Sequence, residues 1–171
     1  MQLLKEIAPT TKRILALHAN SNPVVQTVWS TAAALQVQAT EVHATEAMDF
    51  ERSIESLAKE PDGGFIVIPS GPSRLHRELI ISLAARHRLP AICGLRNFVL
   101  EGGLLSYGID TVDLYYRTAS YVHRILSGTD PADLPVQRPT KFECVINLKT
   151  AKALGLAVPS TLLTIADDVI E

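Results

Sequence analysis

The sequence has few of the residues that mark metal-bound or disulfide-stapled proteins. Two of its 171 residues are cysteines, Cys93 and Cys144, and only 5% are aromatic. The cysteines form no CxxC pair and have no histidine at ligand spacing, so neither a zinc site nor a disulfide framework gains support. Cysteine is among the residue types most often buried, and we expect both to be buried free thiols.

An excess of charge and a long apolar run are also missing. The formal net charge is -2, and lysines and arginines are scattered along the chain. We therefore expect no nucleic-acid partner. The apolar runs are far shorter than the ~20 residues that cross a bilayer. The opening MQLLKE has neither a basic nor an apolar signal-peptide region, so the sequence as given is expected to carry no export signal.

The motifs of cofactor and catalytic sites do not occur. The glycines form neither GxGxxG nor GxxxxGK[ST], no serine lies in GxSxG, and the five histidines are dispersed without HExxH. We therefore expect no cofactor, no metal and no catalytic set. His18, near the end of the first predicted strand, is open to two interpretations, a hydrogen-bonded packing residue or a cleft residue.

The first half of the sequence alternates between strand and helix patterns. Apolar strand patterns cover 14–19, 37–43, 65–68 and 90–93. Helical patterns begin at Pro23, near Asp49 and after Pro72, the last running to Arg88. Short connections between alternating elements predict an α/β fold, a three-layer (αβα) parallel sheet, and the length fits one α/β domain over 1–171.

The second half begins with a long helix over 111–126. Tyr115, Ala119, Val122 and Leu126 lie on one side of it. Residues 129–139 contain three prolines and predict an extended connection. A strand over 142–146 and helices over 149–154 and 160–170 follow, the last with Ser160 as N-cap. We divide the chain into a core lobe (1–103), a crossing with its helix (104–140) and a returning part (141–171).

Ligands of parallel sheets lie beyond the carboxyl ends of the strands. Asn20, Ser21 and Asn22 follow the first strand and either contact a ligand or cap the next helix. Ser70 and Gly71 follow the third strand pattern, where backbone N–H groups bind a carboxylate or the serine caps a helix.

The fourth strand pattern is followed by a pair suited to an amphiphilic ligand. The guanidinium of Arg96 would bind a carboxylate, and the ring of Phe98 would cover an apolar group. Tyr107 would add a hydroxyl or a ring to the same cleft, although half-buried packing is the alternative interpretation.

Three long stretches are similar to one family. They are LLKEIAPTTKRILALHANSNP, the stretch from FIVIPSGPSRLHREL to GGLLSYGID, and PTKFECVINLKTAKALGLAVPSTLLTIADDVIE. Over essentially the whole chain, the sequence resembles the substrate-binding proteins of ABC transporters. The resemblance is to the tryptophan and aromatic amino acid group of the type I periplasmic class, and to its C-terminal lobe with the N-terminal lobe missing. It implies a periplasmic binding protein-like lobe whose loops after Ala19, Pro69 and Gly94 form one wall of a cleft, with Ser106 and Tyr107 near the hinge.

The resemblance implies a solute-binding component without catalysis. Its ligand would be a small molecule, such as an amino acid or another carboxylate, and its partner an ABC transporter permease. Its location would be periplasmic, or cytoplasmic if the chain is a complete product without a leader. The alternative is a cytoplasmic ligand-sensing or assembly module derived from a truncated binding protein. A third hypothesis is an enzyme with the same architecture. We disfavour it because no nucleophile, base and orienting group come together in the sequence.

The apolar side of the helix over 111–126 has no predicted cover within the chain. Exposed apolar patches of several hundred square ångströms mark interaction surfaces. We therefore predict self-association, with a homodimer as the expected state.

Overall fold

The computed structural model describes residues 1–20 and 23–171, and the side chains of 1–20 and 28–171. The predictions for Ser21 and Asn22 lie outside these residues. A seven-stranded sheet forms the centre, in the order β2-β1-β3-β4-β5-β6-β7. The strands are β1 (Arg13–His18), β2 (Gln38–His43), β3 (Gly63–Val67), β4 (Ala91–Cys93), β5 (Leu105–Ile109), β6 (Phe142–Asn147) and β7 (Asp168–Ile170).

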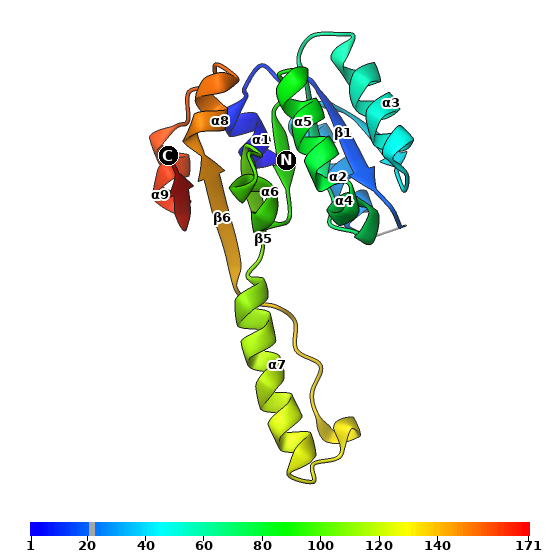
Figure 1. Ribbon diagram of the computed structural model, residues 1–171, viewed down its shortest axis with the longest axis vertical. Coiled ribbons are helices and arrows are strands. Elements are labelled where there is room, and N and C mark those ends of the chain that lie inside the picture. The colour runs from blue at the N-terminus through cyan, green and yellow to red at the C-terminus, as the bar shows by residue number, and fades with distance from the viewer. Residues whose placement is uncertain (21–22) are drawn as a thin grey trace.

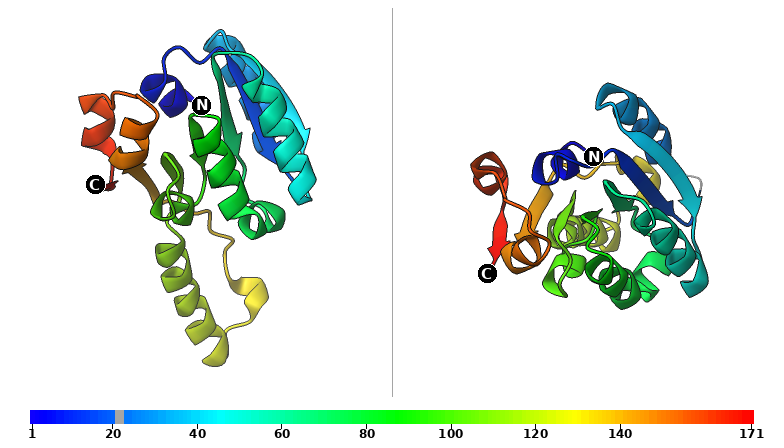
Figure 2. Two further views of the ribbon diagram at one scale, coloured as in Figure 1. Left: turned by 45° about the horizontal axis from the view of Figure 1, so that its top comes forward. Right: turned by 90° about the horizontal axis from the view of Figure 1, so that it is seen from above.

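Helices cover both faces of this sheet, so the predicted three-layer α/β class is confirmed (Figures 1 and 2). On one face, α1 (Gln2–Ile7), α2 (Pro23–Ala34) and α9 (Ser160–Ile165) pack around Ile14, Ile92 and Ile146. On the other face, α3 (Ala47–Ala58), α5 (Arg77–Arg86) and α6 (Arg96–Leu100) pack around Leu15 and Phe65. The short helices α4 (Gly71–Leu75) and α8 (Leu148–Ala153) complete the body.

The sequence predicted a parallel sheet, but one of its strand pairs is antiparallel. β6 pairs with β5 in antiparallel orientation, while β7 runs parallel to β6. The reason is the path between β5 and β6. The chain leaves the sheet through α7 (Thr111–Leu126), turns, and returns through the 3-10 helix η1 (Pro131–Asp133), so it re-enters the sheet from the edge at which it left.

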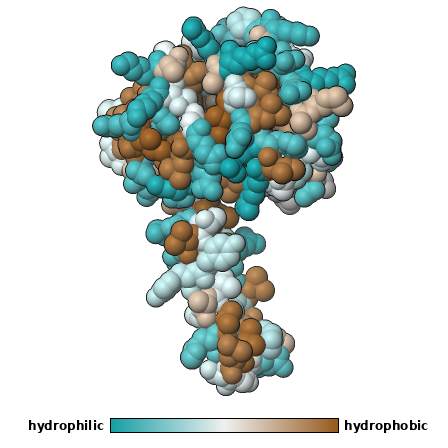
Figure 3. Space-filling view, in the orientation of Figure 1, coloured by the Kyte–Doolittle hydropathy of each residue, from teal (hydrophilic) through white to brown (hydrophobic). Residues whose placement is uncertain are grey.

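Residues 111–139 form a protrusion that we call the arm, which extends from one edge of the body (Figure 1). No residue of α7 is buried. The Tyr121 hydroxyl donates to the carbonyl oxygen of Pro135 at 2.6 Å and joins α7 to the returning segment. Between the two lies a groove of about 410 Å³. Apolar groups are exposed along the arm (Figure 3), among them Leu126 and Val136.

Several local predictions need correction. The helix predicted through Arg88 is broken at His76 into α4 and α5, and Leu75 at the end of α4 is 79% exposed. The last helix ends at Ile165 and is capped by Pro159 instead of Ser160. Residues 168–170 form β7, because pairing with β6 satisfies their backbone groups.

Both cysteines are free and buried, as predicted. Burial raises the pKa of the Cys93 thiol to about 12, so the thiol stays protonated and unreactive at neutral pH. In the described part of the chain, no helix has the length and apolarity needed to span a membrane.

Candidate functional site

The carboxyl ends of three neighbouring strands meet at one edge of the sheet. β1, β3 and β4 are adjacent and parallel, so Asn20 after β1, Ser70 after β3 and Arg96 after β4 lie along the same edge. The arm leaves the body from this edge (Figure 1). The structure therefore brings the predicted loops together, and we call this edge the rim.

A hollow of about 490 Å³ lies at the rim between the body and the base of the arm. This volume is within the range of small-molecule sites. The rim hollow is lined by Arg74, Arg77, Leu95, Arg96, Asn97, Ile109, Asp110, Thr111, Val112, Tyr115 and Glu143. It thus combines cationic groups from α4, α5 and α6 with apolar and aromatic groups from the start of α7.

Two of the three arginines are held by carboxylates of this chain. Arg77 Nε lies 2.5 Å from Glu101 Oε2, and this hydrogen bond raises the pKa of Arg77. Arg96 binds Asp168 and also lies 3.3 Å from Glu143 Oε2; the Asp168 hydrogen bond is the main cause of the raised pKa of Arg96. Arg96, predicted as a ligand contact, therefore ties α6 to β6 and β7.

Arg74 differs from both neighbours. Its side chain is exposed and has no ion-pair partner within the residues that the structure describes. A guanidinium that lines a hollow and has no counter-charge is suited to bind a carboxylate.

The base of the arm is held by a carboxylate that makes several contacts. Asp110 is the N-cap of α7 and accepts from the backbone N–H groups of Val112 and Asp113, both at 3.0 Å. Lys141 Nζ, from the returning segment, lies 2.8 Å from Asp110 Oδ2. The Lys141 contact is the first cause of the lowered pKa of Asp110, and the N-cap hydrogen bonds add to it.

The residues predicted after β1 and β3 have local roles. Ser70 Oγ accepts from the N–H of Ser73 at 3.2 Å, so Ser70 caps α4, one of the two predicted alternatives. Gly71 is exposed at the first position of that helix. The carbonyl oxygen of Asn20, an exposed residue, lies 2.9 Å from His18 Nδ1.

His18 is a packing residue in this structure. It is 6% exposed, and its Nε2 lies 2.6 Å from Glu41 Oε1. Within the described ranges, no three His, Cys, Asp or Glu side chains converge as ligands of a metal.

Phe98 and Ser106 do not lie where the sequence had placed them. The expected loop at residues 95–98 is the start of α6, and helical geometry turns Phe98 inward, where it is 3% exposed in the core. Ser106 is 1% exposed within the sheet, and its Oγ has no hydrogen-bond partner among the described residues. Neither side chain reaches the rim hollow.

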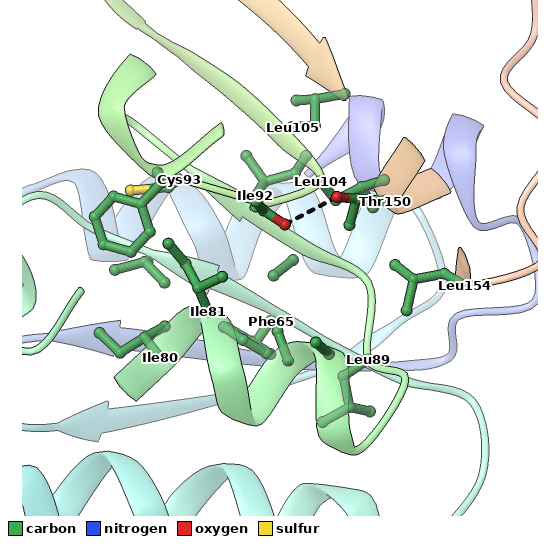
Figure 4. A pocket seen from close by; sticks show the side chains of 17 residues that line it. Phe65, Ile80, Ile81, Leu89, Ile92, Cys93, Leu104, Leu105, Thr150 and Leu154 are labelled. Atoms are coloured by element: carbon green, nitrogen blue, oxygen red, sulfur yellow. Dashed lines mark hydrogen bonds between the residues drawn. The ribbon is translucent and has the colours of Figure 1, made fainter. Parts of the chain in front are cut away.

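Phe98 instead lines a small internal pocket of about 30 Å³ behind the rim (Figure 4). Ile80, Ile81 and Leu105 contribute to its apolar wall, and Thr150 Oγ1 donates to the carbonyl oxygen of Gly102 at 2.9 Å beside it. The space is about that of one or two waters, so it cannot hold an amino acid.

Tyr107 remains accessible but on another face. Side chains alternate along β5, so Tyr107 points away from the face that carries Ser106. Its ring is 50% exposed and stacks on Phe142 with centroids 5.9 Å apart. Tyr107 does not line the rim hollow.

Sequence reasoning missed Arg74, Arg77, Asp110 and Glu143. The i, i+3 spacing of Arg74 and Arg77 after a Ser-Gly-Pro turn was the available signal for the two arginines. No local sequence pattern predicts that Glu143 belongs to the site, because its partner Arg96 lies 47 positions earlier in the chain.

Comparisons with known proteins show the family of the chain. A family model described as "ABC transporter substrate binding protein" matches residues 1–170. A curated tyrosine-binding protein of Clostridioides difficile (strain R20291) is 25% identical over 161 residues, 91% of this chain. The match covers 46% of that relative, so the chain spans about half of its length.

Two solved structures superpose on nearly the whole chain. A conserved domain protein from Vibrio cholerae has a TM-score of 0.86 and 26% identity over 98% of this chain and 58% of its own. An ABC domain from Streptococcus pneumonia, solved in complex with L-Trp, has a TM-score of 0.84 and 25% identity over 99% of this chain and 58% of its own.

Proposed function

Because this chain belongs to the family of ABC transporter substrate-binding proteins, we propose that its rim hollow binds an aromatic amino acid. The observation that carries this proposal is the composition of the hollow, whose lining contains both Arg74, which has no ion-pair partner among the described residues, and the exposed ring of Tyr115. An amino acid with an aromatic side chain would bind Arg74 through its carboxylate and pack its apolar ring against Tyr115. The tyrosine and tryptophan named for two relatives support the same ligand class.

The proposal assigns a role to each part of the chain. Residues 1–103 and 141–171 form the lobe that carries the rim, and residues 104–140 form the crossing. The solute is bound without catalysis and delivered to an ABC transporter permease outside the cytoplasm. Family membership supports this role.

The test is ligand-induced stabilisation of the purified chain. Tyrosine, tryptophan and phenylalanine should raise the melting temperature, because a ligand at a hundred times its Kd adds ~2.7 kcal/mol to the free energy of unfolding. Leucine and the decarboxylated amine tyramine should give smaller shifts. If none of the twenty amino acids stabilises the chain, the proposal is overturned in favour of an assembly module that binds no amino acid.

Arg74→Gln tests which group binds the carboxylate. We expect the Kd for tyrosine to rise about 10- to 100-fold, since a hydrogen bond to a charged group contributes about 1.5–3 kcal/mol. Binding of tyramine should not change. Arg86→Gln is the matched control, because Arg86 is an exposed residue at the far end of α5. An unchanged Kd for tyrosine in Arg74→Gln would remove Arg74 from the site.

A further inference from the structure

The two carboxylates in the lining of the rim hollow differ in how far their charge is satisfied. They belong to Asp110 and Glu143. Asp110 accepts two backbone N–H groups and lies 2.8 Å from Lys141 Nζ, so both its charge and its acceptor capacity are in use. Within the described part of the chain, the side chain of Glu143 has one partner, Arg96, at 3.3 Å between Oε2 and Nη1.

That one partner is shared. Arg96 also binds Asp168 of β7, and this hydrogen bond is the first cause of the raised pKa of Arg96, whereas the Glu143 hydrogen bond contributes least. One positive charge therefore faces two negative charges, and one negative charge is left over. Of the two carboxylates, only Glu143 lines the hollow, so the surplus charge faces the space where a ligand would lie.

The positive charges of the lining leave a matching surplus. Arg77 is bound to Glu101 and Arg96 to Asp168, but Arg74 has no ion-pair partner among the described residues. The hollow thus offers one cation and one carboxylate that the described chain does not neutralise. A ligand with both a negative and a positive group complements this pair better than a simple carboxylate does.

We propose that Glu143 binds the α-ammonium group of the ligand and thereby selects a free amino acid. This inference rests on the proposed function, in which Arg74 binds the carboxylate. The ammonium N–H groups would donate to the Glu143 carboxylate, and hydrogen bonds between charged groups are the strong ones. Related molecules that keep the ring and the carboxylate but lack the ammonium group, such as desamino acids and peptides ending in tyrosine, would leave Glu143 without its donor.

The binding would disturb little of the protein. The ammonium group would replace or share the contact at 3.3 Å between Glu143 and Arg96. Arg96 would keep Asp168, so the tie between α6 and β7 persists with and without ligand. For the same reason, a variant that lacks the Glu143 charge should fold.

Isothermal titration calorimetry with two ligands tests Glu143. L-tyrosine and desaminotyrosine share the phenol ring and the carboxylate and differ only in the ammonium group. We expect the wild-type chain to bind tyrosine about 10- to 100-fold more tightly, since hydrogen bonds to charged groups contribute on this scale. In Glu143→Gln this ratio of the two Kd values should fall toward one, because only tyrosine loses a partner.

Glu78→Gln is the matched control. It removes the same charge from an exposed residue of α5 that does not line the hollow, so the ratio should keep its wild-type value. Circular dichroism would check that both variants are folded. Equal affinity of the wild type for the two ligands, or an unchanged ratio in Glu143→Gln, would overturn the role of Glu143 and leave the aromatic ligand class intact. Binding of neither ligand would overturn the proposed function, and this inference with it.

Discussion

Gly94 and Gly108 touch where β4 and β5 reach the rim, and this contact shows how single residues shape the site. A Cβ atom on Gly108 would lie 2.1 Å from the carbonyl oxygen of Gly94, and a Cβ atom on Gly94 would lie 2.6 Å from Cγ of Pro69. No side chain fits at either distance. The glycines are needed here for close backbone approach, which lets Asp110 and α6 meet around one hollow.

Gly108→Ala should therefore destabilise the protein. The new methyl group meets backbone atoms that cannot rotate away, and overpacking of this kind costs about 1–3 kcal/mol of unfolding free energy. Urea unfolding followed by circular dichroism measures the change. Gly71→Ala is the control, since nothing lies within 4 Å of its Cβ position and alanine favours the helix. Equal stability of both variants would contradict the close approach.

At the scale of elements, the arm is fastened by the ion pair between Asp110 and Lys141. The contact joins the strand that enters the arm to the segment that leaves it, and the backbone N–H of Asp110 also donates to the carbonyl oxygen of Lys141 at 3.1 Å. Because folding lowers the pKa of Asp110, this carboxylate stabilises the folded state above its ordinary pKa of 3.8. The contribution is lost as the pH falls through the folded pKa.

Carbon-detected NMR of the Asp110 carboxyl group checks this direction. We expect its titration midpoint to lie below the ordinary value of 3.8 and to rise in Lys141→Met, because the main cause of the shift is removed. Lys149→Met, at an exposed position of α8, should leave the midpoint unchanged. A midpoint that is the same in both variants would show that the N-cap alone lowers the pKa.

At the scale of the whole molecule, the sequence predicted the layers better than the site. Buried strands such as 65–68 have a local apolar signature, so the α/β class followed from pattern alone. The direction of β6 and the existence of β7 depend on pairing with distant strands, which no local pattern records. The same holds for Arg96, whose carboxylate partner Asp168 lies 72 positions away.

The body and the arm should also differ in stability. The strands of the body are buried, whereas α7 has no buried residue, and an isolated helix of its length is marginal in water. In hydrogen exchange followed by mass spectrometry, peptides from β1 and β3 should be protected at every protein concentration. Peptides from α7 should exchange faster than these, because none of its residues is buried in the described structure. Protection of α7 equal to that of β1 would contradict this difference and would mean that contacts within the arm hold the helix as firmly as the core holds the strands.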